Sequence, residues 1–350
     1  TAGFAETTLP RADIAQTGLF GSMTRPISGQ VLWTYDAGAG ITGSPVYSEG
    51  KIFFGDSTGI LHAIEASEGT LAWSLNTGNP IYGSPVISDG VLYIGNLGGR
   101  LLAVRTASGS QVWDFHTGVG NQAGSIFSSP AVEGNSIFFT ATNGKLYSLD
   151  RNTGKRAWEF QTGRELRSSP LVHENVVYLG DHTGRFHAVD GSSGRKIWGG
   201  GSAGPIDNPA SISGGVVYFG SWDRNLYATR IKGVIPLWRS DTGGAITTPA
   251  AISGTKAFVG TIDGSLVALD LSNGHKLWNF DSDGSFSSSP AVGFNQVFIG
   301  STNGNLYCIG QDRGDKIWEI STGRDIISSP VIADDTLFFG SMNGLLYAVR

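Results

Sequence analysis

The residue types that enzymes use for chemistry are few in this chain and do not stand in catalytic spacings. The histidines belong to no HExxH segment and to no Cys–His cluster with zinc spacing. Serines cluster in stretches such as 287–289, but Ser-Pro recurs in several repeats, which indicates a structural role rather than one catalytic nucleophile. The sequence therefore assigns no catalytic residue and predicts no metal site. The histidines are His62, His116, His173, His182, His187 and His275.

Two short motifs and one thiol have simpler structural interpretations. Asp-x-Thr-Gly occurs at Asp56 and Asp181, where it fits either a cation-binding loop or, more simply, a hairpin turn. His62 and His187 take positions that hold tyrosine in other repeats, so we interpret both as strand residues. The single cysteine, Cys308, excludes an internal disulfide, and we expect a buried, unreactive thiol because other repeats hold alanine or serine there.

A sequence repeat defines the elements that must position these residues. Eight of the nine tryptophans are spaced 40, 40, 45, 40, 40, 40 and 40 residues apart. A fixed interval of this length indicates a repeat architecture, in which each unit buries its apolar face only against its neighbours. The eight are Trp33, Trp73, Trp113, Trp158, Trp198, Trp238, Trp278 and Trp318.

Each repeat contains four short runs rich in β-branched and aromatic residues. In the seventh repeat these runs are 288–292, 296–300, 305–309 and 316–320, and Gly, Asn and Asp stand between them. Such runs predict a four-stranded antiparallel meander, with strands A to D in chain order. Several such sheets around an axis form a β-propeller.

The strand count predicts how the ring closes. Proline marks strand A eight times, but the last repeat ends in its third strand, and residues 31–35 form a fourth strand without a repeat of their own. Pairing the two covers a sheet edge. We therefore predict an all-β, eight-bladed β-propeller over residues 29–350, with residues 29–38 completing blade eight and residues 1–28 forming an N-terminal arm. The prolines are Pro45, Pro85, Pro130, Pro170, Pro209, Pro249, Pro290 and Pro330.

The segments 149–158 and 189–198, which end in Trp158 and Trp198, resemble the tryptophan-docking motif of PQQ-like propellers. The motif recurs in all seven complete repeats, and residues 11–18 resemble the arm that often precedes such propellers. The resemblance implies that each indole packs between neighbouring blades, largely buried. The family includes quinone-dependent dehydrogenases, an outer-membrane protein assembly lipoprotein and sensor domains of bacterial kinases.

The dehydrogenases of this family carry adjacent cysteines, a calcium site and blade insertions. This chain has one cysteine and near-minimal repeats. We therefore expect it to belong to a non-dehydrogenase branch that binds neither PQQ nor another cofactor.

Composition limits the classes of partner. The net charge is −5, so we expect no basic surface for nucleic acid. No apolar run approaches the ~18 residues that span a membrane. The first residue is Thr1 rather than methionine, which we interpret as processing of a secreted or periplasmic chain. We expect an extracytoplasmic monomer.

Positions that vary between repeats on one face are candidates for binding. The D–A and B–C connections share a face of a meander blade. One variable ring near the start of strand A includes Tyr82, Phe127, Arg167 and Asp207, and the alternation of strand side chains points it toward the mouth of the central channel. We expect Arg167 and Asp207, in adjacent blades, to form an ion pair there.

A second variable ring lies at the tips of the B–C connections. It includes His182 and the apolar residues Leu97, Trp222 and Met342, and exposed apolar groups beside polar ones are typical of binding surfaces. The alternative is that each apolar tip packs against a neighbouring loop. Irregular repeats converge on the same sector, since repeat three carries an insertion at residues 119–124 and repeat five lacks its turn glycine.

Two functions remain open from the sequence. We favour a scaffold that binds a protein, a peptide or a glycan on the D–A and B–C face, because the loops are short and lack a catalytic signature. The alternative is a small-molecule site at the channel mouth, in a ligand-binding protein or a cofactor-independent enzyme with cyclase- or lyase-like acid–base chemistry. A deep pocket would favour the alternative, and a flat or plugged mouth would favour the scaffold. The pocket would be lined by Tyr82, Phe127, Arg167, His182 and Trp222.

Overall fold

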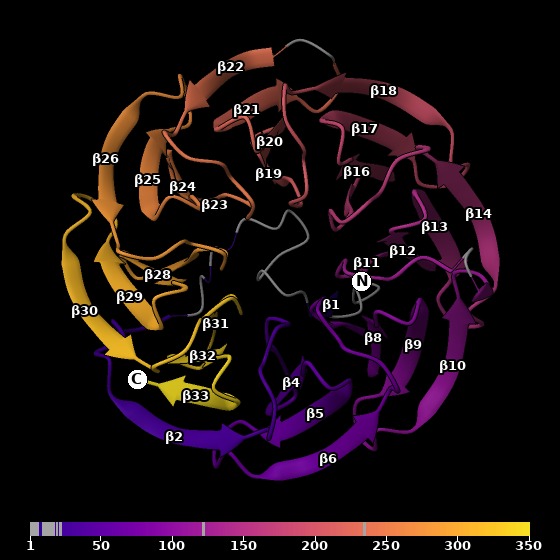
Figure 1. The fold of residues 1–350 in the computed structure, drawn as a ribbon, viewed down its shortest axis with the longest axis horizontal. Helices are drawn as coiled ribbons and strands as arrows, with labels where there is room; N and C mark the ends of the chain where they lie inside the picture. Colours follow the sequence, from indigo (N-terminus) through magenta and orange to yellow (C-terminus); the bar gives the residue numbers. More distant parts are fainter. Residues whose placement is uncertain (1–6, 9–17, 19, 21–22, 121–122, 234–235) are drawn as a thin grey trace, which may run out of the picture.

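The computed structural model describes residues 7–8, 18, 20, 23–120, 123–233 and 236–350. Eight antiparallel sheets surround a central axis (Figure 1), and none of the elements in these residues is an α-helix. Among the described residues there is accordingly no helix with the length and apolarity needed to cross a membrane. The predicted eight-bladed, all-β propeller is confirmed.

Each blade runs from a short strand A near the axis to a strand D at the rim (Figure 1). Strands A are β3 (Val46–Ser48), β7 (Val86–Ser88), β11 (Ala131–Glu133), β15 (Leu171–His173), β19 (Ser211–Ser213), β23 (Ala251–Ser253), β27 (Ala291–Gly293) and β31 (Val331–Ala333). Strands B are β4 (Lys51–Gly55), β8 (Val91–Gly95), β12 (Ser136–Ala141), β16 (Val176–Gly180), β20 (Val216–Gly220), β24 (Lys256–Gly260), β28 (Gln296–Gly300) and β32 (Thr336–Gly340).

Strands C are buried on both faces between the blades, whereas strands D are half exposed at the rim. Strands C are β5 (Ile60–Glu65), β9 (Arg100–Arg105), β13 (Lys145–Asp150), β17 (Arg185–Asp190), β21 (Asn225–Arg230), β25 (Ser265–Asp270), β29 (Asn305–Gly310) and β33 (Leu345–Val349). Strands D are β6 (Leu71–Asn76), β10 (Gln111–His116), β14 (Arg156–Gln161), β18 (Lys196–Gly201), β22 (Pro236–Asp241), β26 (Lys276–Asp281), β30 (Lys316–Ser321) and β2 (Val31–Asp36).

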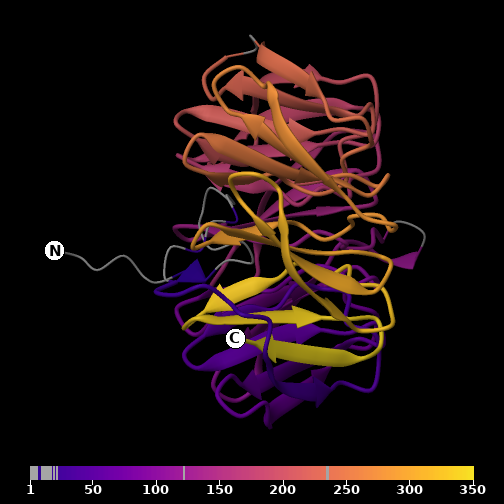
Figure 2. The same ribbon diagram turned by 90° about the vertical axis from the view of Figure 1, so that its left-hand side faces the viewer.

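The ring closes through the two ends of the chain. Strand β2 pairs antiparallel with β33, with Trp33 opposite Ala348 and Tyr35 opposite Leu346. Figure 2 shows indigo β2 beside the yellow strands of blade eight. The pairing predicted from the missing last strand is therefore confirmed, and it joins the N-terminal and C-terminal segments in one sheet.

The periodic tryptophans dock between neighbouring blades, as the resemblance implied. The Trp158 Nε1–H donates to the Gly191 carbonyl of the next blade at 3.0 Å, and the indole lies against Gly194. Gly194 has a φ of +70°, and a Cβ there would come within 2.7 Å of the indole, so the position requires glycine. The expectation of largely buried indoles is confirmed, although none of the eight is completely buried, because strand D borders solvent.

The described part of the N-terminal segment lies against the innermost strands. Strand β1 (Thr7–Thr8) pairs with β7 as a fifth strand. The Phe20 N–H donates to the Val292 carbonyl in β27, and the Val292 N–H donates to the Gly18 carbonyl. Residues 11–17 of the predicted arm and residues 121–122 of the predicted insertion lie outside the described residues.

Candidate functional site

The D–A connections of all eight blades converge on the axis and line a cavity of about 210 Å³. Each blade contributes an outer, variable residue and an inner residue that is mostly serine. The outer residues are Thr42, Tyr82, Phe127, Arg167, Asp207, Thr247, Ser287 and Ile327. The inner residues are Ser44, Ser84, Ser129, Ser169, Pro209, Pro249, Ser289 and Ser329. Four of the eight predicted site residues, Tyr82, Phe127, Arg167 and Asp207, thus surround one cavity.

The inner serines tie the blades together. The Ser44 N–H donates to Ser84 Oγ at 3.0 Å, and the Ser84 N–H donates to Ser129 Oγ at 2.9 Å. Blades five and six hold Pro209 and Pro249 at this position, and proline has no N–H to donate, so the series is interrupted there. The recurring Ser-Pro unit is therefore structural, as expected. Equivalent bonds join Ser129 to Ser169, Ser289 to Ser329, and Ser329 to Ser44.

The outer residues of blades two to four touch one another. The ring centroids of Tyr82 and Phe127 are 5.6 Å apart, and the Arg167 guanidinium carbon lies 5.4 Å from the centroid of the Phe127 ring. A cation over an aromatic face at this distance is attracted to it. Because the Tyr82 side chain is 42% exposed, this part of the mouth presents aromatic surface beside a cation to solvent.

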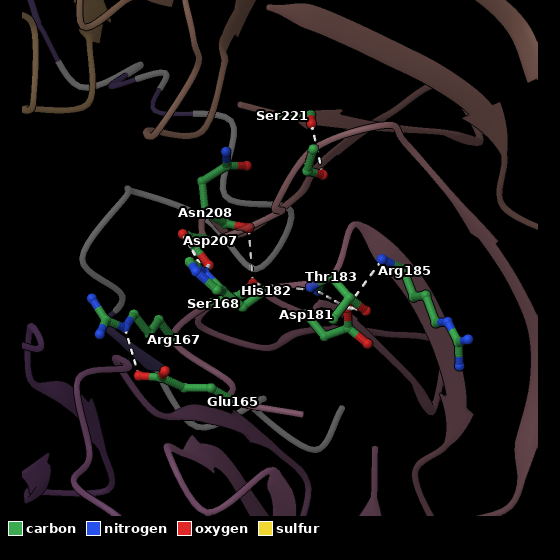
Figure 3. A network of polar contacts seen from close by, with 12 residues as sticks. Glu165, Arg167, Ser168, Asp181, His182, Thr183, Arg185, Asp207, Asn208 and Ser221 are labelled. Atoms are coloured by element: carbon green, nitrogen blue, oxygen red, sulfur yellow. Dashed lines mark hydrogen bonds and ion pairs between the residues drawn. The ribbon is translucent and has the colours of Figure 1, made fainter. Parts of the chain in front are cut away.

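The predicted ion pair between Arg167 and Asp207 is wrong. Arg167 Nε donates to Glu165 Oε1 at 2.8 Å, and His182 Nδ1 lies 3.0 Å from Asp207 Oδ1 (Figure 3). The reason is local reach. Glu165 is two residues from Arg167, and the backbone bond from the His182 N–H to the Glu165 carbonyl, 3.3 Å long, holds the B–C tip beside the D–A connection. Arg167 therefore pairs with Glu165, and Asp207 pairs with His182, instead of with each other.

The predicted B–C ring lies on the same face but outside the cavity. Backbone N–H groups of Leu97, Trp222 and Met342 donate to carbonyls of the D–A connections, at Pro80, Pro205 and Asp325 respectively. These bonds place both sets of connections on one face, as expected. Neither these three residues nor His182 lines the cavity. Trp222 in blade five and Met342 in blade eight are 44% and 37% exposed, so each presents apolar surface beside the mouth.

One ring nitrogen of His182 remains available as a hydrogen-bond acceptor. The tautomer that donates from Nδ1 to Asp207 leaves Nε2 as a hydrogen-bond acceptor, and the structure gives that atom no partner among the described residues. The His182 side chain is exposed, and the Asp207 side chain is largely covered.

The two Asp-x-Thr-Gly segments are hairpin turns capped by their aspartates. Asp181 Oδ1 accepts the N–H groups of Thr183 and Arg185, and Oδ2 lies 3.0 Å from His187 Nε2. Burial alone would raise the pKa of Asp181, but the bonds from His187, Thr183 and Arg185 outweigh it and hold that pKa below its usual value. Asp56 and His62 repeat the arrangement in blade one.

The histidine–aspartate pairs are a feature that our sequence reasoning missed. The signal was present, since histidine replaces tyrosine in strand C only in the two repeats that carry Asp-x-Thr-Gly. The bond between Arg167 and Glu165 was also missed, and no repeat pattern indicated it.

The cavity residues do not fit a quinone cofactor with its calcium ion. The carboxylate in the lining, Asp207, is engaged by His182, and the nearby Glu165 is engaged by Arg167. Cys308 is buried in β29, where burial raises the pKa of its thiol far above the usual value. Within the described residues, no three or more His, Cys, Asp or Glu side chains are grouped to hold a metal ion.

Comparison with known proteins gives one family and many similar folds. A family model described as outer membrane protein assembly factor BamB matches residues 22–232 and 142–350. The search of curated proteins finds no match.

Three solved structures illustrate the fold, and at these identities the likeness extends to the fold alone. BamB from Moraxella catarrhalis is 18% identical with a TM-score of 0.79, covering 92% of this chain and 99% of that chain. The computationally designed Ika8 protein is 16% identical with a TM-score of 0.81, covering 92% and 100%. Quinohemoprotein alcohol dehydrogenase from Comamonas testosteroni is 14% identical with a TM-score of 0.83, covering 98% and 80%.

Proposed function

Because the chain belongs to the outer membrane protein assembly factor BamB family, we propose that it is a protein-binding scaffold that holds a segment of a partner protein at the mouth of the ring. The observation that carries this proposal is the cavity on the loop face. Its outer residues Tyr82, Phe127, Arg167 and Asp207 combine aromatic surface with both signs of charge. Such a mixture suits a polypeptide segment, whose side chains and backbone are both apolar and polar.

The size of the cavity favours a protein partner over a free small molecule. Its volume of about 210 Å³ lies below the roughly 300–1,000 Å³ of typical small-molecule sites. It can hold one side chain or a chain terminus while the rest of the segment lies over the surrounding B–C tips, such as Trp222. Aromatic and arginine side chains are the usual anchors of protein interfaces.

We also propose an extracytoplasmic location. The support is the family description, which names an outer membrane assembly factor.

A small-molecule enzyme is the second candidate, and the His182–Asp207 pair is the observation that favours it. The pair provides an oriented imidazole at the cavity rim, which is a common general base. Its substrate would be small, given the cavity volume. His182→Gln should then abolish turnover, whereas a scaffold would retain partner binding.

Site-specific photo-crosslinking tests the scaffold proposal. A benzophenone amino acid at position 82 should give a discrete protein adduct in cells, and Arg167→Ala should reduce its yield. Position 68 is the control, because Glu68 lies exposed in a C–D turn on the opposite face. Adducts from position 68 but not from position 82 would contradict the proposal.

A further inference from the structure

The fifth residue of strand D fills the seam between one blade and the next. It is large and apolar in six of the eight blades, but it is Gly200 in β18 and Ser240 in β22. The six are Tyr35, Leu75, Phe115, Phe160, Phe280 and Ile320.

The seam between blades two and three shows how this residue packs. Phe139 and Tyr147 stack at 5.0 Å between ring centroids, and Phe115 meets both edge-on, at 5.9 and 5.6 Å. The seam between blades four and five repeats the stack with Phe219 and Tyr227 at 5.1 Å. At that seam Gly200 stands in place of Phe115 and contributes no side chain.

A compensating substitution fills only part of the vacated space. Gly200 pairs with Phe186, whereas Phe115 pairs with Leu101, and leucine holds this strand C position in the seven other blades. Phe186 stacks on Phe219 at 4.3 Å. A cavity of about 90 Å³ remains, and Gly200, Phe186, Trp198, Phe219 and Tyr227 are among its lining residues.

The remaining cavity has the size and chemistry for one aliphatic side chain. Four of its nine lining residues are aromatic. Its volume is below the roughly 150 Å³ of a cavity that takes a benzene ring. Leu75 and Ile320 show that an aliphatic side chain serves at the equivalent position in two other seams. The cavity shares Gly201, Tyr227 and Pro236 with a second cavity of about 550 Å³. That larger space can take the backbone from which such a side chain projects.

The outer edge of β18 is also accessible to a backbone. Strand β18 is the last strand of its sheet, and no described strand pairs with its outer edge. Its final residues, Gly199, Gly200 and Gly201, carry no side chain that would hold another chain away.

We propose that the seam between blades four and five binds a leucine-sized aliphatic side chain of an extended partner segment. The partner's side chain takes the place that the chain's own strand D residue occupies elsewhere. The inference rests on the proposed function in that the occupant belongs to a partner protein, but the seam lies on the outer wall rather than at the mouth.

Tethering with NMR detection tests this site. Leu237, which is 44% exposed and lines the larger cavity, is replaced by cysteine in the full chain, and a short peptide with one ¹³C-methyl-labelled leucine is linked to it by a disulfide. A short tether gives an effective concentration of about millimolar. Seated among four aromatic rings, the leucine methyl resonances should shift upfield.

Filling the cavity from within is the matched control. Gly200→Leu should abolish the upfield shift and raise Tm, because the Gly200 position is open, with no atom within 4 Å of a Cβ placed there. The double variant Phe186→Leu with Gly200→Phe recreates the blade-two seam and should act in the same way. Methyl resonances that stay at their free positions in the tethered protein, or that shift equally in both filled variants, would overturn the proposal. Crosslinking at position 82 should be unaffected by Gly200→Leu. The proposal for this seam and the proposal for the mouth can therefore be refuted independently.

Discussion

Replacing Phe160 by tyrosine should stabilise the protein, because a buried nitrogen beside it lacks a hydrogen-bond partner. His187 donates through Nε2 to Asp181, and its buried Nδ1 has no partner among the described residues. In blade one the same nitrogen of His62 lies 3.3 Å from the Tyr35 hydroxyl. Tyr35 and Phe160 meet their histidines alike, at 5.8 Å and 67° and at 5.7 Å and 65°. A hydroxyl added to Phe160 should therefore reach Nδ1 as it does in blade one.

The expected gain is that of one hydrogen bond to a buried acceptor. Such a bond contributes about 1 kcal/mol, and leaving a buried acceptor unpaired costs about 1–3 kcal/mol. For a chain of this length, a gain of about 1 kcal/mol raises Tm by only about 1–2 °C. The free energy of unfolding from urea titration is the more sensitive measurement.

The reciprocal variant provides the control. Tyr35→Phe should remove the partner of His62 and destabilise the protein by about 1 kcal/mol. A Phe160→Tyr variant that is no more stable than the parent, while Tyr35→Phe is destabilised, would show that water satisfies His187. If neither variant changes stability, the comparison between blades is refuted.

Three further predictions concern the stability of the propeller. Trp158→Ala should cost about 2–3 kcal/mol, below the value for a fully buried indole, whereas Trp222→Ala should change unfolding in urea by less than about 0.5 kcal/mol. Deleting residues 1–36 should expose the edge of blade eight, and light scattering should detect aggregation or calorimetry a lower Tm. Stability should fall in acid. Burial lowers the pKa of His187 below 6.5, and the bonds to Asp181 lower the pKa of that carboxyl below 3.8, so the unfolded chain binds more protons than the folded one. The urea midpoint should therefore decrease as the pH falls below about 6.5, and again through about 3.8.

Each of these has a contrary outcome. Equal costs at Trp158 and Trp222 would remove the distinction between docking and surface indoles. A truncated protein that keeps its Tm and stays monodisperse would contradict the claim that pairing of β2 with β33 stabilises the propeller. A urea midpoint that stays constant from about pH 7.5 to 5 would show that His187 binds its proton equally in both states.

The sequence predicted the fold well because a propeller repeats one short-range pattern eight times. The tryptophan interval and the strand-A prolines each count the blades, and the incomplete last repeat indicated the pairing of β2 with β33. Comparing repeats also predicted that Tyr82, Phe127, Arg167 and Asp207 lie together at the mouth, because equivalent positions share one orientation in a symmetric ring.

Contacts that differ between blades could not be predicted in the same way. The partner of Arg167 depends on how far each side chain reaches across a connection, and two residues along the chain were enough for Glu165. In the sequence, the seam at Gly200 shows only as two substitutions in one repeat. Glycine stands at the fifth position of strand D, and Phe186 replaces the usual leucine of the paired strand C.

The most direct test of the binding mouth compares two arginine variants in the same blade. Arg167 lies at the cavity, and Arg195 lies exposed in a C–D turn on the opposite face. Once the protein crosslinked at position 82 is identified, its dissociation constant is measured by calorimetry for the parent, Arg167→Ala and Arg195→Ala, with Tm recorded for each. We predict that Arg167→Ala weakens binding by about tenfold or more, as expected for loss of an interface arginine, while Arg195→Ala leaves it unchanged and neither alters Tm. Weaker binding by Arg195→Ala, with Arg167→Ala unaffected, would contradict the assignment of the mouth.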